Sequence, residues 1–227
     1  MSWPRNAKIA FIGSHGIRKT TAALAFASVI QRAGRSVEFA REVVRDNPLG
    51  INETATGEAQ LWVLTSQIRR ELELSQKAEC LVTDRGVMDN FAYYLRACGG
   101  EDRYEVGPLV RTWSRTYDLV VRLTPDVHIR ADGVRSTNDR FRDEIEAILD
   151  ARLPRLVSRD RLIMQPASQI TEQHDWWPLA EQLAARLGEP LLAVGVSRPS
   201  RRRRRSAPRG NGAQDATDDQ LALDLGR

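Results

Sequence analysis

Residues 9–21 constrain the fold more than any other part of the chain. The apolar run Ile9-Ala-Phe-Ile12 is followed by the polar, glycine-bearing stretch Gly13-Ser-His-Gly-Ile-Arg-Lys-Thr-Thr21. Residues 7–13 are predicted to form a buried strand, and residues 19–33 a helix, because apolar positions recur there at helical spacing. Two glycines between these elements allow a sharp turn. The chain is therefore expected to contain the strand-turn-helix unit of an α/β protein.

The turn between this strand and this helix has nearly the spacing of a phosphate-binding loop, G-x-x-x-x-G-K-[ST]. Backbone N–H groups at the start of the helix point toward bound phosphates, and the helix dipole favours their negative charge. Lys19 is expected between the β- and γ-phosphates of ATP, and the Thr20 hydroxyl is expected to coordinate Mg²⁺. The residues predicted to bind ATP are Gly13, Ser14, His15, Gly16, Ile17, Arg18, Lys19, Thr20 and Thr21.

Arg18 departs from this pattern, because the position before the lysine is usually glycine. A Cβ at that position can clash with the nucleotide or alter the backbone dihedrals. Two interpretations follow: a degenerate loop that transfers nothing, or a working loop in which the Arg18 side chain points outward. The other motifs of the chain bear on which interpretation is correct.

Strands and helices alternate along the remainder of the chain. Strands are expected at residues 36–40, 80–83, 119–123 and 162–164, and helices at residues 58–76, 88–97, 139–153 and 176–187. This alternation predicts an α/β fold with a mostly parallel sheet and helices on both faces. From residue 197 the composition changes to Ser, Arg, Pro, Gly, Asn and Asp. We therefore expect a kinase-type domain at residues 1–196 and a disordered tail at residues 197–227.

Composition limits the class of protein. A chain of 227 residues, 41% of them hydrophobic, can bury one sizeable core. Cys80 and Cys98 have no metal-ligand spacing, and no apolar run approaches the roughly 20 residues that cross a bilayer. The expectation is a reduced cytoplasmic protein, in the host cytoplasm if it is viral, with no membrane partner. The net charge of +4 equals the excess of arginine over aspartate in the tail.

A carboxylate follows the second predicted strand, at the sheet edge where open α/β sheets bind ligands. Glu42 is the candidate to accept a proton from an attacking hydroxyl, with Asp46 as the alternative. A charged, solvated helix start explains the same residues equally well.

An acid and a base lie side by side at the end of the third predicted strand, in Leu81-Val-Thr-Asp84-Arg85-Gly86. Asp84 can hold Mg²⁺ directly or through water, as the second predicted metal ligand beside Thr20. Arg85 can clamp a phosphate or the acceptor.

An arginine-rich segment with a glycine precedes the helix at residues 139–153. Its position between the late strands suits a mobile lid that brings positive charge to the transferred phosphoryl group and excludes water. Arg130 and Arg135 are the expected contacts, whereas Arg140 and Arg142 face solvent or pair with neighbouring acids.

Together, G-S-H-x-x-x-K-T-T, the acid after the second strand, TDRGVMDNFAYY and DGVRSTNDRFRDEI resemble the thymidylate-kinase-like and AAA-type P-loop kinases over residues 7–190. The resemblance implies that the loop binds ATP, that Glu42 or an acid near it serves the acceptor hydroxyl, and that Asp84 and Arg85 contact magnesium or acceptor. It also implies that the lid arginines surround the phosphates. The helix that carries Gln60, Trp62 and Gln67 would line the acceptor pocket, although it is equally well a core helix with one polar face.

The tail bears on the choice of acceptor. Five consecutive arginines (Arg201, Arg202, Arg203, Arg204 and Arg205) can attract DNA or RNA without regard to sequence, or simply solubilise the chain. The terminal segment Gln220-Leu-Ala-Leu-Asp-Leu225 is similar to peptides that dock on bacterial sliding clamps.

These features favour an acceptor hydroxyl within DNA. Among related families, the kinases that phosphorylate 5-hydroxymethyluracil in viral DNA, a step in thymine hypermodification that protects against host nucleases, fit best. Such a target has to leave the base stack. The alternatives are a kinase of free deoxynucleoside monophosphate such as dTMP, and a catalytically silent protein that uses ATP as a binding switch.

Overall fold

Five parallel strands form the centre of the molecule. The computed structural model describes residue 3, residues 5–126 and residues 138–198. The strands β1 (Ala7–Ile12), β2 (Val37–Ala40), β3 (Cys80–Asp84), β4 (Leu119–Thr124) and β5 (Leu162–Pro166) lie in the order β2-β3-β1-β4-β5. Every neighbouring pair is parallel, so the carboxyl ends of all five strands meet at one edge of the sheet. The predicted parallel sheet is confirmed.

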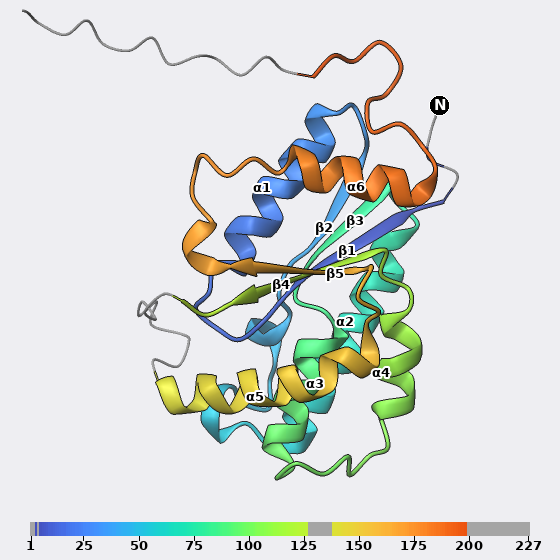
Figure 1. Cartoon of the computed structure of the whole chain (residues 1–227). Coiled ribbons are helices and arrows are strands. Elements are labelled where there is room, and N and C mark those ends of the chain that lie inside the picture. Colours follow the sequence, from blue (N-terminus) through green and yellow to red (C-terminus); the bar gives the residue numbers. More distant parts are fainter. Residues whose placement is uncertain (1–2, 4, 127–137, 199–227) are drawn as a thin grey trace, which may run out of the picture.

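Helices cover both faces of this sheet (Figure 1). Helices α1 (Lys19–Arg32) and α6 (Trp177–Leu187) lie on one face, and α2 (Gly57–Ser75), α3 (Val87–Ala97), α4 (Gly107–Ser114) and α5 (Asp139–Leu156) lie on the other. Alternate residues of β1 serve the two layers, because successive side chains of a strand point to opposite faces. Ile9 and Phe11 belong to the core beneath α1 and α6, whereas Ala10 and Ile12 belong to the core beneath α2 and α3.

Helix α4, the end of α5 and the end of β5 differ from the sequence-based expectation; β5 was expected at residues 162–164 and extends to Pro166. Helix α4 was not predicted from the sequence; its Pro108 lies in the first turn, a position to which proline is well suited. Helix α5 was expected to stop at residue 153 but continues through Pro154 to Leu156. A proline so close to the C-terminal end removes one hydrogen bond from a helix that is about to end.

Several predicted features lie outside the described residues. These are the lid arginines Arg130 and Arg135, the arginines at positions 201–205, and the segment at positions 220–225. In the ranges that are described, no helix is both long and apolar enough to cross a membrane. Cys80 and Cys98 are buried free thiols.

Candidate active site

The loop after β1 is shaped by Gly13. Its φ is 141°, and a Cβ there would lie 2.5 Å from Ile17 Cδ1 and 2.7 Å from the carbonyl oxygen of Leu123. Gly16 also has a positive φ, of 74°. The loop therefore requires a residue without a side chain at its first position, because both backbone angle and space exclude a Cβ.

Arg18 adopts the backbone conformation that normally selects glycine. It is the N-cap of α1 with φ 63° and ψ 23°, in the left-handed region. Its exposed side chain donates from Nη1 to the carbonyl oxygen of Ile170, 2.7 Å away. Ile170 follows the short helix η3 (Ala167–Gln169) beyond β5. The guanidinium is thus held by the segment after β5 and not by a residue of the loop.

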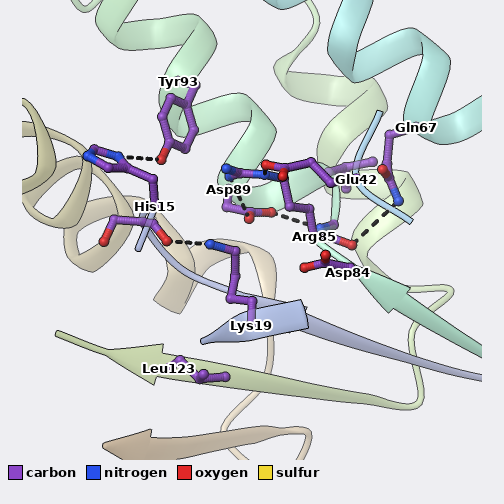
Figure 2. Close-up of polar contacts among 12 residues, drawn as sticks. His15, Lys19, Glu42, Gln67, Asp84, Arg85, Asp89, Tyr93 and Leu123 are labelled. Atoms are coloured by element: carbon purple, nitrogen blue, oxygen red, sulfur yellow. Dashed lines mark hydrogen bonds and ion pairs between the residues drawn. The ribbon is translucent and has the colours of Figure 1, made fainter. Parts of the chain in front are cut away.

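Lys19 is buried and folded across the loop. Its Nζ donates to the carbonyl oxygen of Ser14 (Figure 2). Burial, together with the nearby charge of Arg85, lowers the pKa of Lys19 to about 7. Within the described ranges no carboxylate forms an ion pair with Lys19, and a phosphate bound in the loop would supply one.

Thr20 and Asp84 meet beside the loop. The Thr20 hydroxyl donates to Asp84 Oδ2 over 2.5 Å. Asp84 reaches this place because it ends β3 in register with Phe11 of β1. Burial raises the pKa of the Asp84 carboxyl, against the lowering effect of Lys19. A hydroxyl and a carboxylate in contact are the hard oxygen ligands that Mg²⁺ prefers.

These two side chains fit a Mg²⁺ ion that takes its other ligands from phosphates and water. Magnesium is commonly held by one or two protein oxygens plus substrate phosphates. Within the described ranges, no group of three or more His, Cys, Asp or Glu side chains could hold a metal by itself. The donor set therefore suits an ion that arrives with a nucleotide.

Arg85 lies at the centre of a buried ion cluster (Figure 2). Its Nε donates to Glu42 Oε1, and its Nη1 lies 3.4 Å from Asp89 Oδ2. The three side chains are at most 8% exposed. Arg85 also has a positive φ of 87°, which costs a non-glycine residue about 1–3 kcal/mol and is concentrated at functional sites.

Asp89 was missed by sequence reasoning. Its carboxylate accepts from the Gly86 N–H over 2.8 Å at the start of α3, and burial raises its pKa. The available signal was its position four residues after Arg85, which places the two on one side of a helical turn.

His15 joins the loop to α3 and α5. Its Nδ1 lies 3.1 Å from the Tyr93 hydroxyl, and its ring stacks on Phe141 with centroids 5.1 Å apart. Burial and the charges of Arg85 and Lys19 lower the pKa of His15 to about 4. The imidazole is therefore neutral at pH 7 and does not add charge to the site.

A pocket opens beside the loop, with about 510 Å³ of empty space, part of it solvent. It is lined by His15, Glu42, Val44, Arg45, Ile51, Asn52, Gln60, Val63, Arg85, Asn90, Tyr93 and Phe141. Two of its buried polar atoms, His15 Nε2 and Asn90 Nδ2, have no hydrogen-bond partner within the described part of the chain. Unpaired buried polar atoms are costly, so their place in the wall of a pocket indicates a ligand that pairs with them.

The structure separates the two candidate acids. Glu42 is buried and lines this pocket, whereas Asp46 is exposed, pairs with Arg41 at 3.4 Å and does not line it. The alternative of a solvated helix start does not apply to Glu42, because the short helix η1 (Val44–Asp46) begins after it.

Of the α2 side chains predicted to line the acceptor pocket, one lines it and two do not. Gln60 lines the pocket, but Trp62 is not among the lining residues. Gln67 lies deeper and donates to the Arg85 carbonyl oxygen over 3.4 Å and to Glu71 over 2.9 Å. Gln67 therefore supports Arg85 and does not face the pocket.

A buried arginine ties α5 to the loop, and it was not predicted. Arg122 of β4 is fully buried and donates to the carboxylate of Glu146 on α5. Glu146 in turn accepts the Ser14 N–H over 3.0 Å. The signal was a charged residue inside the apolar strand sequence LVVRLT, because a buried arginine requires a partner.

Comparisons with known proteins show the family and the fold. A family model described as AAA domain matches residues 8–165. A crystal structure of NadR protein in complex with NR is 17% identical, with a TM-score of 0.62, covering 86% of this chain and 54% of that one. The chain thus spans about half the length of the NadR protein. A search of curated proteins gave no match.

Two nucleotide-related kinases share the fold over most of their length. Thymidylate kinase from Candida albicans is 16% identical, with a TM-score of 0.51, covering 78% of this chain and 92% of that one. Deoxyadenosine kinase from M. mycoides is 14% identical, with a TM-score of 0.50, covering 80% and 95%. The described chain therefore has a P-loop kinase-like fold.

Proposed function

The chain belongs to the AAA domain family, and on that premise we propose that it is a phosphotransferase that moves the γ-phosphoryl group of ATP to a hydroxyl of a nucleoside-type or nucleotide-type acceptor. One observation carries the proposal. The Thr20 hydroxyl and the Asp84 carboxylate are in contact at 2.5 Å beside Lys19, and a pocket lined by Glu42 and Arg85 opens at the same loop. A phosphate donor site and an acceptor pocket are thereby adjacent.

The residues of the loop would hold the donor. Lys19 leaves the Ser14 carbonyl and contacts the β- and γ-phosphates, where its charge stabilises the transition state. Thr20 and Asp84 would hold Mg²⁺, which neutralises phosphate charge when bound. The lid residues Arg130 and Arg135 are proposed to contact the transferred group.

The pocket would hold the acceptor. The acceptor oxygen forms a bond to the γ-phosphorus, the bond from that phosphorus to the bridging oxygen of ADP breaks, and the hydroxyl proton passes to the Glu42 carboxylate. Arg85 orients Glu42 through their ion pair and presents its remaining N–H groups to the phosphoryl oxygens. Binding acceptor and donor side by side in this way supplies the proximity that such a transfer requires.

For the acceptor we propose 5-hydroxymethyluracil in DNA. The support is the arginine-rich tail, which can attract nucleic acid, and the position of the acceptor in a pocket, which a base has to leave the stack to enter. A sliding clamp is a proposed partner of the segment Gln220 to Leu225, on its leucine spacing. The structural neighbours named for thymidylate and deoxyadenosine favour the alternative, a free nucleotide or nucleoside.

Labelled ATP separates these acceptors. The protein is incubated with DNA containing hydroxymethyluracil, with plain DNA and with dTMP, and label is expected in the modified DNA alone. Transfer to dTMP but not to modified DNA would replace the lead acceptor with the alternative. ATP binding with no transfer to any acceptor would support a binding switch instead.

Matched variants test the residue roles. Glu42→Gln is expected to lower kcat by about 10²- to 10⁴-fold, the usual contribution of a general base. Asp46→Asn, an equal change on an exposed residue four positions away, is expected to stay within about twofold. Equal effects of the two variants would remove Glu42 from the mechanism.

A further inference from the structure

A second pocket, distinct from the candidate active site, lies between α3, α4 and α5. It has about 650 Å³ of empty space, part of it solvent, and we call it the arginine pocket. Phe91, Leu95, Pro108 and Leu156 are its apolar lining residues. Three arginines line it as well: Arg111 on α4, and Arg152 and Arg155 on α5.

The three arginines of this pocket are unpaired in the part of the chain that the structure describes. All three are exposed, and within residues 5–126 and 138–198 none of their guanidinium groups donates to a protein acceptor. Other exposed arginines of the described residues differ among themselves: Arg69 pairs with Glu73 and Arg140 with Glu144, whereas Arg115 and Arg159 have no side-chain partner in the same ranges. The arginine pocket is distinguished by three such guanidinium groups, from two helices, that line one pocket.

Among the described residues that line the arginine pocket there is one acid, Asp102, and it is already hydrogen-bonded. Asp102 accepts the N–H of Val106 over 2.9 Å and the N–H of Gly107 over 2.8 Å at the start of α4. Asp150, two residues before Arg152, pairs instead with the buried Arg122. The arginine pocket therefore keeps a positive charge, and like charges at Arg152 and Arg155, three residues apart on one helix, repel each other.

The two pockets share two helices. Residues of α3 line both, through Asn90 and Tyr93 at the active site and Phe91 and Leu95 at the arginine pocket. On α5, Phe141 lines the first and Arg152 the second. At 1.5 Å per residue these positions are about 16 Å apart, which is about five stacked nucleotides of one strand.

We propose that the arginine pocket binds phosphate groups of a single-stranded nucleic acid that carries the acceptor nucleotide. Arginine suits this ligand because its planar guanidinium binds phosphate through two parallel hydrogen bonds, and an apolar floor can take the face of a base. The inference rests on the proposed function in one respect only: the acceptor is part of a polynucleotide. A small phosphate compound would present the same phosphate oxygens to these arginines. The test therefore has to distinguish a nucleic acid from a free phosphate compound.

The test uses the full chain with three substitutions, Arg111→Gln, Arg152→Gln and Arg155→Gln. The control chain carries Arg32→Gln, Arg69→Gln and Arg186→Gln, which remove the same charge from exposed positions on α1, α2 and α6. Both keep the tail, so its contribution is equal. Thermal unfolding within a few degrees of the parent shows that each variant is folded.

Binding of a fluorescent single-stranded oligonucleotide is measured by anisotropy at several salt concentrations, without ATP. Each phosphate contact contributes about 0.7 to the slope of log K against log salt for a single strand. The pocket variant is expected to lose about 2 from this slope, and the control less than about 0.5. Equal losses in both variants would overturn the inference, because the arginines would then act only through net charge.

Competition with tripolyphosphate identifies the source of the phosphate. If the pocket variant loses tripolyphosphate binding but binds the oligonucleotide like the control, the nucleic-acid assignment is wrong. The measurement also stands apart from catalysis. If the slope changes but DNA is not phosphorylated, the arginine pocket binds nucleic acid and DNA is not the acceptor. If DNA is phosphorylated but the slope is unchanged, DNA is the acceptor and the inference about the arginine pocket is wrong.

Discussion

The conformation of Arg18 allows the cost of its left-handed backbone to be measured directly. Arg18→Gly and Arg18→Ala both remove the hydrogen bond to the Ile170 carbonyl oxygen, so this loss cancels between them. They differ only in the Cβ held at φ 63°. A residue with a Cβ in the left-handed region destabilises the folded state by about 1–2 kcal/mol. Glycine avoids this cost, but its greater freedom in the unfolded chain lowers the free energy of unfolding by about 0.4–1 kcal/mol. Arg18→Gly is therefore expected to be about 1 kcal/mol more stable than Arg18→Ala.

The comparison with the parent protein follows from the same terms. The lost hydrogen bond is worth about 0.5–1 kcal/mol at an exposed residue, so Arg18→Ala should lose that amount and Arg18→Gly should stay near the parent. Equilibrium unfolding in urea measures both, and a difference of about 2–4 °C in Tm should accompany it. Equal stabilities of the two variants would refute the argument from backbone strain.

Turnover of the same variants tests the direction of the side chain. Because the guanidinium contacts Ile170 and not the loop, Arg18→Gly should retain phosphoryl transfer to within about threefold. A loss of one hundredfold would show instead that Arg18 acts on the phosphates.

Further predictions concern the loop and its metal site. Lys19→Ala should abolish phosphoryl transfer, and activity within a few-fold of the parent would exclude Lys19 from the mechanism. Because the pKa of Lys19 is about 7 without ligand and phosphates favour its charged form, ATP binding should take up a proton above pH 7, which calorimetry in buffers of different ionisation enthalpy detects. The same pKa lies below the unfolded value of about 10.4, so the free energy of unfolding should rise with pH between these values, and this rise should vanish in Lys19→Met. Asp84→Asn should raise the Mg²⁺ concentration needed for half-maximal transfer, and an unchanged requirement would argue against its role as a ligand. Gly13→Ala should cost at least about 2 kcal/mol by overpacking and strain, whereas Gly99→Ala, at a positive φ of 69° in open space, should cost about 1 kcal/mol in urea unfolding.

Local sequence signals were sufficient for most of the fold. The apolar strands, the helix that starts at Lys19 and the order of elements all follow from periodicity and glycine placement, which act over a few residues. Thr20 and Asp84 were assigned to one metal site, and they lie in contact because β3 and β1 are neighbours. The shared role was predicted from the loop motif together with the acid at the end of the third strand.

The features that the sequence did not predict depend mostly on contacts between segments that are distant in the chain. Arg122 pairs with Glu146 of another element, and no local pattern encodes that partner. Asp89 has a local signal in its spacing from Arg85, but the third member of that cluster, Glu42, lies 43 positions from Arg85. The pairing of the Arg18 side chain with Ile170 joins residues 152 positions apart. Periodicity places an element in the fold, but it does not say which buried polar groups meet after folding.

The segment after β5 has a practical consequence for the choice of expression boundaries. The family match ends at residue 165, yet Trp176 packs against Phe11 and Phe26 with centroids 5.5 and 6.4 Å away. Farther along, Arg35 donates to the Leu191 carbonyl oxygen over 3.0 Å, and the Ala193 N–H donates to Ala33 over 2.9 Å. A recombinant fragment cut at the family limit would uncover α1 and one face of the sheet, so biochemical work on this kinase-like fold should keep the chain at least to residue 196.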